Sequence, residues 1–360
     1  MATPKKKAPA KKAVPKAVKA PKSAKAAAAP AAAAPAKAKR PWLVPVVMVA
    51  VLLGVGGQIY LRARYLASLK FDMMRIGRVV PRGSDRGQCL SVLSVAADKA
   101  GDVFVQEFEG EEARLQRFDA MLSPETEIYK PAKPDQRIVE PADMDVAADG
   151  TVMVLLKDGR VQVISRDLKY LRTIKTGLQG PSGVTVDSTG RLFVTSMADN
   201  KVVFFDAKGT RAGEFGAPGT QTGDLVNPRR IRATKDDELV IIESTEKSIR
   251  GKIFKKDLTL RKTFLVENLQ FCEPVKLGVT GDGKAFLNDH MGARAVVSFD
   301  ISNGKFFGES QITKDGLKFI SPGSLGANRY NSTVYVHSVI GLVACYPPTA
   351  ADEKAAEAAK

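Results

Sequence analysis

The sequence predicts an all-β domain, a β-propeller of six blades, which follows a basic tail and one transmembrane helix. Three observations support this prediction. A motif repeats six times within residues 71–348, each copy contains short apolar runs separated by turn residues, and a spare strand precedes the first copy. Repeats of about 40–50 residues with several short strands each match the blades of a propeller.

Residues 1–40 form the basic tail. They contain twelve Lys and Arg residues and no acidic residue, so only +4 of the net charge of +16 belongs to residues 41–360. Six prolines interrupt any helix here and the lysines repel one another, which predicts a disordered polycationic segment. The rest of the chain is too weakly basic for a protein that binds nucleic acid throughout. We favour a cytoplasmic arm that sets membrane topology, and the alternative is a tether for DNA or another polyanion.

Residues 41–61 contain no charged residue and predict a transmembrane signal-anchor helix. A helix of this length spans about 30 Å, the thickness of the bilayer's hydrocarbon core. Trp42 and Tyr60 lie near its two ends, where amphipathic rings favour the membrane interface. The excess of cations before the span predicts a cytoplasmic amino end and a single pass through the inner membrane. Residues 62–70 are then a linker, and the propeller is periplasmic or extracellular.

Five of the six repeats begin with a proline, and a turn residue follows nine positions later. The prolines are Pro141, Pro181, Pro228, Pro274 and Pro322. The turn residues are Gly150, Gly190, Asp237, Gly283 and Asn331. The first copy lacks the proline but keeps the offset, from Val92 to Gly101. A constant offset indicates one structural unit repeated six times, and we number these units as blades 1 to 6.

The two ends of the array predict a closed ring rather than a solenoid. The last repeat stops after residue 346 without a fourth strand, whereas residues 71–80 supply a spare strand at the front. Two glycines precede Val92 with the spacing found before Pro228: Gly83 and Gly87, compared with Gly219 and Gly223. We therefore expect strand 71–80 to complete the sixth blade and leave no open edge. Residues 349–360 are expected to form a disordered tail.

The third repeat resembles an NHL repeat, on the motif PSGVTVDSTGRLFVTSMADNKVVFFDAKGTRAGEFG followed by GTQTGDLVNP. The similarity is good in this unit and fair around Pro274, and it covers roughly residues 71–348. The resemblance implies a six-bladed propeller that binds a partner rather than catalyses a reaction. NHL repeats often carry an Asp at the end of the second strand. The matching positions here hold Glu107, Leu156, Ser196, Glu243, Asp289 and His337.

The resemblance also implies a second class of function, because related propellers include lactonases and an amidating lyase that use a metal in the central channel. The candidate metal ligands are Glu243, Asp289, His290 and His337. The chain contains no G-x-S-x-G or H-E-x-x-H motif and no phosphate-binding glycine loop. We therefore predict no cofactor and leave a divalent metal open, with a metal-dependent hydrolase or lyase for a small periplasmic substrate as the alternative function.

Three cysteines, Cys89, Cys272 and Cys345, are an odd number for an oxidising compartment. Ring closure would make the blades of Cys89 and Cys345 neighbours, so these two can form a disulfide or remain buried free thiols. We favour free thiols, because unpaired cysteine is among the most buried residue types.

A binding surface is predicted at the start of the innermost strands, near the mouth of the channel. The residue two positions after the start of each repeat is expected at this mouth. In blades 1 to 6 it is Ser94, Asp143, Gly183, Arg230, Lys276 and Ser324 in turn. The predicted surface comprises Arg229, Arg230, Arg232, Lys276 and Asp143. Its cationic sector would dock an acidic envelope or membrane protein, or an anionic polymer. The alternative is a solvated face with scattered charge. The predicted role is a protein-interaction scaffold or docking module in a cell-envelope assembly.

Overall fold

The computed structural model describes residues 74–347 apart from 110–111, 130, 132, 220, 246–247, 267–273, 290–295, 311, 315–316, 319–323 and 339–340. The predictions for the tail (1–40), the span (41–61), the linker (62–70) and the carboxyl-terminal tail (349–360) lie outside these residues. Among the described residues, no helix is long and apolar enough to cross a membrane.

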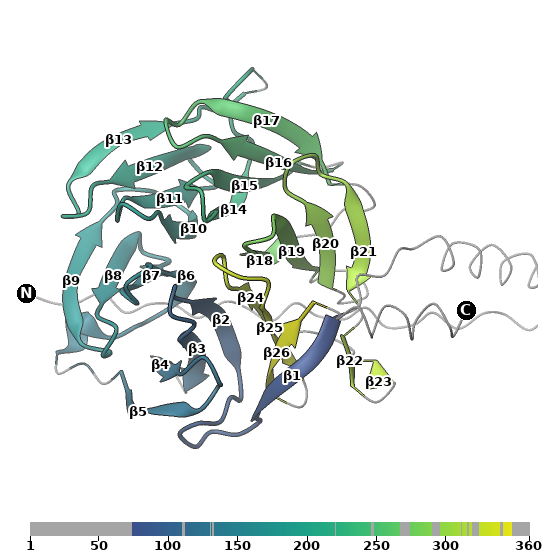
Figure 1. Ribbon diagram of the computed structural model, residues 1–360. Coiled ribbons are helices and arrows are strands. Elements are labelled where there is room, and N and C mark those ends of the chain that lie inside the picture. The colour runs from purple at the N-terminus through teal and green to yellow at the C-terminus, as the bar shows by residue number, and fades with distance from the viewer. Residues whose placement is uncertain are drawn as a thin grey trace, which may run out of the picture. The chain divides into compact units, whose positions relative to one another are not determined.

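Six antiparallel sheets are arranged as a ring of blades (Figure 1). Blade 1 contains β2 (Val92–Ala97), β3 (Val103–Glu109), β4 (Glu112–Phe118) and β5 (Pro124–Ile128). Blade 2 contains β6 (Pro141–Val146), β7 (Val152–Leu156), β8 (Arg160–Ile164) and β9 (Tyr170–Lys175). Blade 3 contains β10 (Pro181–Val186), β11 (Leu192–Ser196), β12 (Lys201–Phe205) and β13 (Arg211–Phe215).

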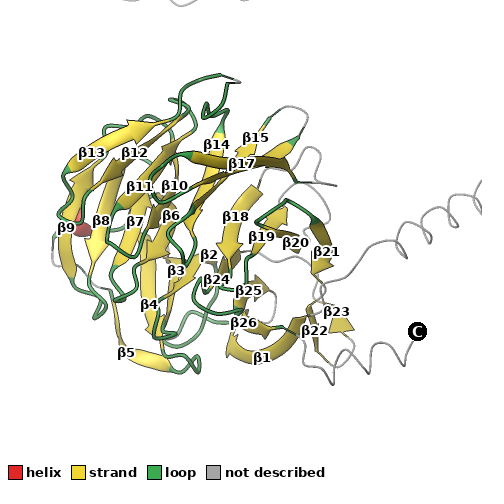
Figure 2. Cartoon of the chain, turned by 45° about the horizontal axis from the view of Figure 1, so that its top comes forward, coloured by secondary structure: helices red, strands yellow, loops and turns green. Residues whose placement is uncertain are grey.

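Blade 4 contains β14 (Pro228–Ala233), β15 (Leu239–Ser244), β16 (Ile249–Phe254) and β17 (Leu260–Leu265). Blade 5 contains β18 (Pro274–Val279), β19 (Lys284–Asp289), β20 (Val296–Asp300) and β21 (Phe306–Ser310). Blade 6 contains β24 (Ser324–Ala327), β25 (Val334–Ser338) and β26 (Gly341–Tyr346). Among the described residues the helical segment is η1 (Pro134–Gln136), a single 3₁₀ turn that leads into blade 2 (Figure 2).

The ring is closed by a strand from the front of the propeller. β1 (Met74–Pro81) pairs antiparallel with β26, so it supplies the fourth strand of blade 6. The inner strand β24 contacts the inner strands of both neighbours, β18 and β2. These contacts exclude the solenoid, because a solenoid leaves its two ends apart. A short hairpin, β22 (Ile312–Lys314) and β23 (Leu317–Lys318), extends blade 6 beyond β1 and was not expected from the repeat pattern.

The turn residues of the repeat have the backbone conformation that their identity suggests. Gly101, Gly150, Gly190 and Gly283 have φ between 81° and 98°, a region that side chains disfavour. Asp237 takes the same place in blade 4 with φ 62°, where Asp is tolerated better than most residues. Each of these residues reverses the chain between the first and second strands of its blade.

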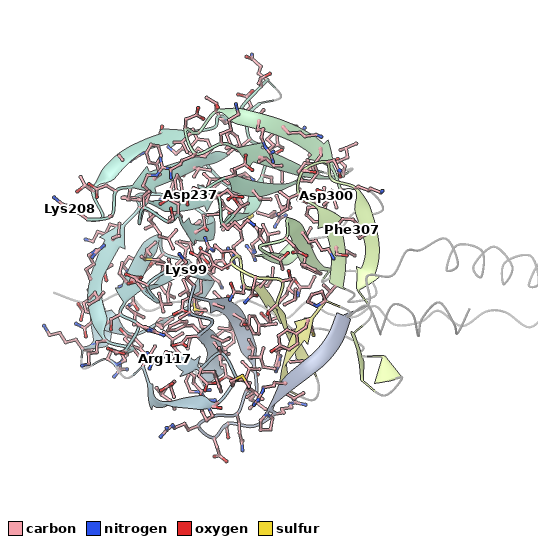
Figure 3. The ribbon with its side chains drawn as sticks, viewed as in Figure 1. Lys99, Arg117, Lys208, Asp237, Asp300 and Phe307 are labelled. Carbon is pink, nitrogen blue, oxygen red and sulfur yellow. The ribbon has the colours of Figure 1, made fainter. Side chains whose placement is uncertain are left out.

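The hydrophobic core lies between neighbouring blades rather than at the centre of the ring. One cluster joins Leu155 and Ile174 of blade 2 to Val184 and Val194 of blade 3. Another joins Ile242 and Ile253 of blade 4 to further apolar side chains of blade 5. Figure 3 shows side chains filling the spaces between the sheets. This arrangement leaves the centre of the ring to polar residues.

Cys89 and Cys345 are both buried free thiols, as we favoured, and Cys272 lies outside the described residues. The two side chains belong to separate core clusters. Burial raises the pKa of Cys345 to about 12 and raises that of Cys89 further, so both thiols are protonated at neutral pH.

Candidate functional site

The inner strands share a bulge that determines which side chains meet at the centre. In blades 1 to 5 the pairing with the second strand shifts by one residue just after the first position of the inner strand. The residue after the shift is Ser94, Asp143, Gly183, Arg230 or Lys276. These are the positions that the sequence predicts at the channel mouth, and a bulge re-aims the side chains beside it.

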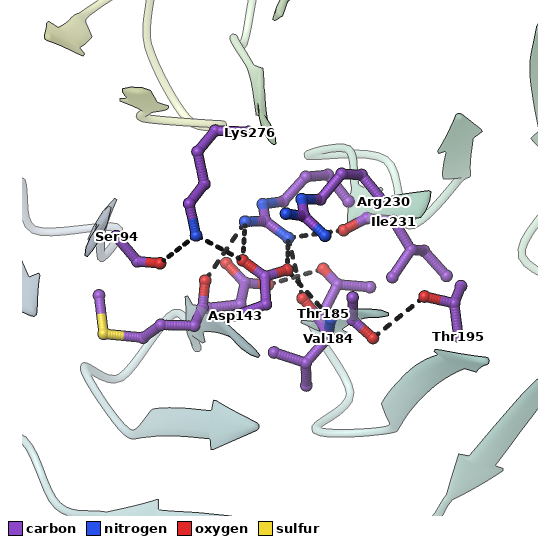
Figure 4. A network of polar contacts seen from close by, with 12 residues as sticks. Ser94, Asp143, Val184, Thr185, Thr195, Arg230, Ile231 and Lys276 are labelled. Carbon is purple, nitrogen blue, oxygen red and sulfur yellow. Dashed lines mark hydrogen bonds and ion pairs between the residues drawn. The ribbon is translucent and has the colours of Figure 1, made fainter. Parts of the chain in front are cut away.

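Asp143 lies at the centre of this arrangement (Figure 4) and is paired with Arg232. The Asp143 carboxylate is fully buried and accepts two hydrogen bonds from Arg232, of 2.7 and 2.9 Å, and one of 3.2 Å from the Val184 N–H. Burial alone would raise the pKa of Asp143, but the charge and hydrogen bonds of Arg232 outweigh burial and hold that pKa well below its usual range. Blades 2 and 4 are thereby joined by a bidentate ion pair.

Lys276 reaches the same group from blade 5. Its Nζ donates a 2.8 Å hydrogen bond to Ser94 Oγ and lies 3.9 Å from an Asp143 oxygen. Burial is the main cause that lowers the pKa of Lys276 from 10.5 to about 7, and it outweighs the attraction of Asp143. Arg230 and Arg232 lower it further by repulsion. We call Ser94, Asp143, Arg230, Arg232 and Lys276 the channel cluster.

A second buried ion pair lies one step further along the inner strands. Arg329, in the turn that follows β24, donates from Nη2 to both carboxylate oxygens of Asp145. The same carboxylate accepts hydrogen bonds from Thr185 Oγ1 (2.6 Å) and the Val186 N–H (3.0 Å). This pair joins blade 6 to blade 2.

Polar side chains of one blade also satisfy the backbone of the next inner strand. Thr185 Oγ1 accepts from the Ala233 N–H at 2.8 Å, and Ser182 Oγ donates to the Pro228 carbonyl at 2.7 Å. Ser324 Oγ donates to the Leu93 carbonyl at 3.0 Å. Inner strands have no sheet partner on the channel side, so such side chains complete the hydrogen bonding that buried backbone requires.

The predicted binding residues are brought together, but mostly inside the ring. Asp143, Arg232 and Lys276 are at most 8 % exposed. Arg230 is half-buried and its Nη1 donates to the Ser182 and Arg229 carbonyls. Arg229 is also half-buried. The structure therefore joins Asp143, Arg232 and Lys276 through ion pairs, and Arg230 is a further charge that acts on Lys276. The role of these residues in docking a partner stays a prediction.

Glu243, a candidate metal ligand, takes part in contacts that hold a loop in place. Its fully buried carboxylate accepts from the Val226 N–H at 2.9 Å and forms ion pairs with Arg250 (3.0 Å) and Lys252 (3.3 Å). These groups hold the loop before blade 4 against the blade. Three neighbours already occupy the carboxylate, so a metal would have to displace them.

The equivalent carboxylate in blade 1 has the same role. Glu107 accepts from the Leu90 N–H at 2.7 Å, from Arg114 at 2.8 Å and from Gln116 at 2.7 Å. The loops before blades 1 and 4 also share an internal hydrogen bond, which a backbone N–H donates to the side chain three residues later. The Asp85 N–H donates to Gln88 Oε1 at 3.4 Å, and the Gln221 N–H donates to Asp224 Oδ2 at 2.8 Å. We call these two carboxylates with their partners the loop anchors.

Of the remaining metal candidates, the structure describes the side chain of His337 alone. The side chain of Asp289 and all of His290 lie outside the described residues. His337 is buried, and burial lowers its pKa. No group of three or more His, Cys, Asp or Glu side chains suited to a metal occurs in the part of the chain that the structure describes.

Two structural features were missed by the sequence analysis. The Asp145–Arg329 pair was missed because its partners are 184 residues apart and only ring closure brings them together. The loop anchors were missed although their signal was present. Glu107 and Arg114 are spaced like Glu243 and Arg250, and the same glycine spacing precedes both blades.

Together these features define a six-bladed β-propeller in which buried ion pairs join inner strands of different blades. No protein-family model matches the chain, and no curated protein matches it in sequence. Among solved structures, the β-propeller domain of Cps50 (Swd1) from Myceliophteria thermophila is similar at 9% identity with a TM-score of 0.51, over 77% of this chain and 100% of that one. This likeness shows the fold alone.

Two lyase structures also match the chain. A streptogramin B lyase matches at 13% identity and a TM-score of 0.49, over 76% of this chain and 87% of that one. A catalytically inactive virginiamycin B lyase from Staphylococcus aureus, solved with quinupristin, matches at 18% identity and a TM-score of 0.49, over 71% of this chain and 79% of that one.

Proposed function

We propose that this protein is a membrane-anchored, NHL-like propeller that serves as a docking module for another protein of the cell envelope. The uncharged stretch at 41–61, preceded by twelve cations, supports the anchor and the export of the propeller. The repeat motif of blade 3 supports the relation to NHL repeats. A closed ring suits docking, because it holds its surface loops in fixed positions.

The observation that carries this proposal is a group of exposed apolar side chains on the rim of blades 1 and 2. Leu90, Phe108 and Val139 are 41%, 48% and 44% exposed. Leu90 and Val139 occupy equivalent places, two residues before the inner strands of their blades. We call these three residues the rim patch.

Backbone contacts place Phe108 between the other two residues. The Phe108 N–H donates to the carbonyl of Ser91, next to Leu90, at 3.1 Å. Phe108 also pairs with Ala113 across β3 and β4, and the Ala113 N–H donates to the carbonyl of Ile138, next to Val139, at 2.9 Å. Adjacent exposed apolar side chains mark interaction surfaces more often than single ones do.

The rim patch and the predicted cationic sector lie at the same end of the blades. Arg229 and Arg230 follow the first residue of β14 as Leu93 and Ser94 follow the first residue of β2, and Leu93 lies three residues after Leu90 of the rim patch. A partner that combines an apolar contact with acidic side chains fits this end of the ring, because a charged periphery around an apolar centre is typical of protein interfaces. We therefore propose an acidic envelope protein as the partner.

The proposal is tested by cross-linking and co-purification of the tagged full-length protein from native membranes. The variant Phe108→Ser with Val139→Ser is expected to lower recovery of a specific partner by about tenfold, since truncating central apolar contacts typically costs more than 1 kcal/mol. Leu171→Ser is the matched control, because Leu171 is equally exposed (49%) but lies on the outer strand β9 of blade 2. Equal recovery with both variants would contradict the proposal.

Two alternatives stay predictions. A metal-dependent hydrolase or lyase would require a stoichiometric divalent metal in the purified protein. A tether for DNA or another polyanion would require steeply salt-dependent binding through residues 1–40.

A further inference from the structure

One position in the third strand of each blade is polar in three blades and apolar in the other three. Across the second strand, it lines up with the residue that directly follows the predicted channel-mouth position of the inner strand. In blades 1, 2 and 4 it holds Gln116, Gln162 and Lys252. In blades 3, 5 and 6 it holds Val203, Val297 and Val343. We call it the clamp position.

The clamp position is buried in every blade, whether its residue is polar or apolar. All six side chains are at most 4 % exposed. A buried polar side chain lowers stability unless it is hydrogen-bonded, and the three valines show that the fold accepts an apolar residue here. The reason for a polar residue in blades 1, 2 and 4 therefore lies in what its side chain binds.

The three polar side chains bind the same carbonyl of the repeat. Each donates a hydrogen bond to the residue four places before the first residue of the inner strand of its blade. The donors and acceptors are Gln116 and Gln88 (3.0 Å), Gln162 and Arg137 (2.9 Å), and Lys252 and Asp224. The clamp position thus holds the loop that leads into its own blade.

The loops held in this way are those that carry the proposed docking surface. The bound carbonyl lies two residues before Leu90 in blade 1 and two residues before Val139 in blade 2, and both belong to the rim patch. In blade 4 the loop leads to Arg229 and Arg230 of the predicted cationic sector. By contrast, the loop before blade 3, residues 176–180, contains no charged residue and no exposed large apolar side chain, and blade 3 has a valine at the clamp position.

Gln162 is the clearest of the three clamps. Its Nε2 also lies 3.4 Å from the Asp135 carbonyl, and its Oε1 has no hydrogen-bond partner in the part of the chain that the structure describes. The hydrogen bonds of this buried amide therefore go to the loop. Blade 2 has Leu156 where blades 1 and 4 have the carboxylates of the loop anchors, so Gln162 holds its loop without an anchor.

We propose that Gln116 and Gln162 are positioning residues of the docking surface, which hold Leu90 and Val139 in the arrangement that the partner binds. This inference rests on the docking function proposed above and adds the residues that order the surface. A loop that is already ordered loses less conformational entropy when the partner binds. Loosening it weakens binding even though the rim patch itself is unchanged. Lys252 has the same role for the loop that leads to Arg229 and Arg230.

The test uses Gln162→Val in the full-length protein, which copies the valine of the other three blades. We expect partner recovery by cross-linking and co-purification to fall about fivefold, because the loop must now be ordered on binding. Amide exchange at Gln136 and Arg137 is expected to be about tenfold faster, because the loop opens more often. Gln116→Val is the second variant, with amide exchange read at Gln88.

Val203→Ala is the matched control, because Val203 holds the clamp position of blade 3 and is fully buried. The cavity is expected to lower the Tm by about 3–8 °C, more than Gln162→Val does. Partner recovery and amide exchange at Gln136 and Arg137 are expected to stay at the wild-type level. The variant with less effect on stability should thus have the larger effect on binding.

Three outcomes would overturn the inference. Partner recovery that follows the Tm across Gln162→Val and Val203→Ala would assign Gln162 a role in stability only, as would unchanged amide exchange in Gln162→Val. Full recovery with Gln162→Val and with Gln116→Val, beside a loss with Phe108→Ser and Val139→Ser, would overturn this inference and leave the docking proposal standing. Full recovery in all of these variants would overturn the docking proposal and this inference with it.

Discussion

The channel cluster and the loop anchors both bury carboxylates with cations, but they are assembled differently. In the loop anchors, Glu107 and Glu243 bind an Arg seven residues away on the next strand of the same blade. In the channel cluster, Asp143 binds an Arg that is 89 residues away and two blades further round the ring. The anchors therefore need one folded blade, whereas the channel cluster needs the closed ring.

This difference predicts where a lost carboxylate matters most. Asp143→Asn removes the buried carboxylate that pairs with Arg232 and lies 3.9 Å from Lys276. We expect a loss of about 3–5 kcal/mol in the free energy of unfolding, the usual cost of breaking a buried pair. Urea unfolding measures this loss. Asp158→Asn is the control, because Asp158 pairs with Arg160 on the surface and is 52% exposed. Similar midpoints for the two variants would mean that Asp143 does not organise the centre of the ring.

The comparison can be sharpened between the two anchors. We expect Glu243→Gln to cost about 2–4 kcal/mol, and more than Glu107→Gln, because uncompensated buried cations are destabilising. Glu243 faces two cations, Arg250 and Lys252, whereas Glu107 faces Arg114 and the neutral Gln116.

Lys252→Gln converts the blade 4 anchor into the blade 1 arrangement and serves as the matched variant. In the Lys252→Gln variant, the further change Glu243→Gln should lower the free energy of unfolding about as much as Glu107→Gln lowers it in the wild type. Urea unfolding of these variants measures both differences, and a larger cost for Glu107→Gln in the wild type would contradict this account.

The last prediction is a pH dependence to which the channel cluster contributes through Lys276. The pKa of Lys276 falls from 10.5 to about 7 on folding, so between these values the unfolded chain binds more protons than the folded protein. The free energy of unfolding therefore rises with pH from about 7 to 10.5, by at most about 1.4 kcal/mol per pH unit from this group. Chemical unfolding at pH 7, 8 and 9 measures the slope. Lys276→Met should reduce the slope, and an unchanged slope would assign it to other groups.

Much of the fold could be predicted because its pattern is local. The offset from each proline to its turn residue, as from Pro181 to Gly190, reflects a single β-hairpin, and hairpins depend on residues close in sequence. The sequence also predicted that Glu107, Ser196 and Glu243 hold equivalent positions near the end of the second strand. The structure confirms this, because each of them pairs with the first residue of the inner strand of its blade. The β22–β23 hairpin could not be predicted, because it lies outside the repeat.

The sequence by itself determined that this chain has six similar blades, because the offset from the start of each repeat to its turn residue is constant. It also determined which positions of each blade face the centre, because side chains alternate between the two faces of a strand. Only the tertiary structure decided what those positions do. Arg232 and Lys276 look like surface cations in the sequence, but ring closure brings them to the fully buried Asp143 and lowers their exposure to 8 %. The physical reason is that buried charges are governed by partners from other blades, and distances between blades are set by packing of the closed ring rather than by separation along the chain.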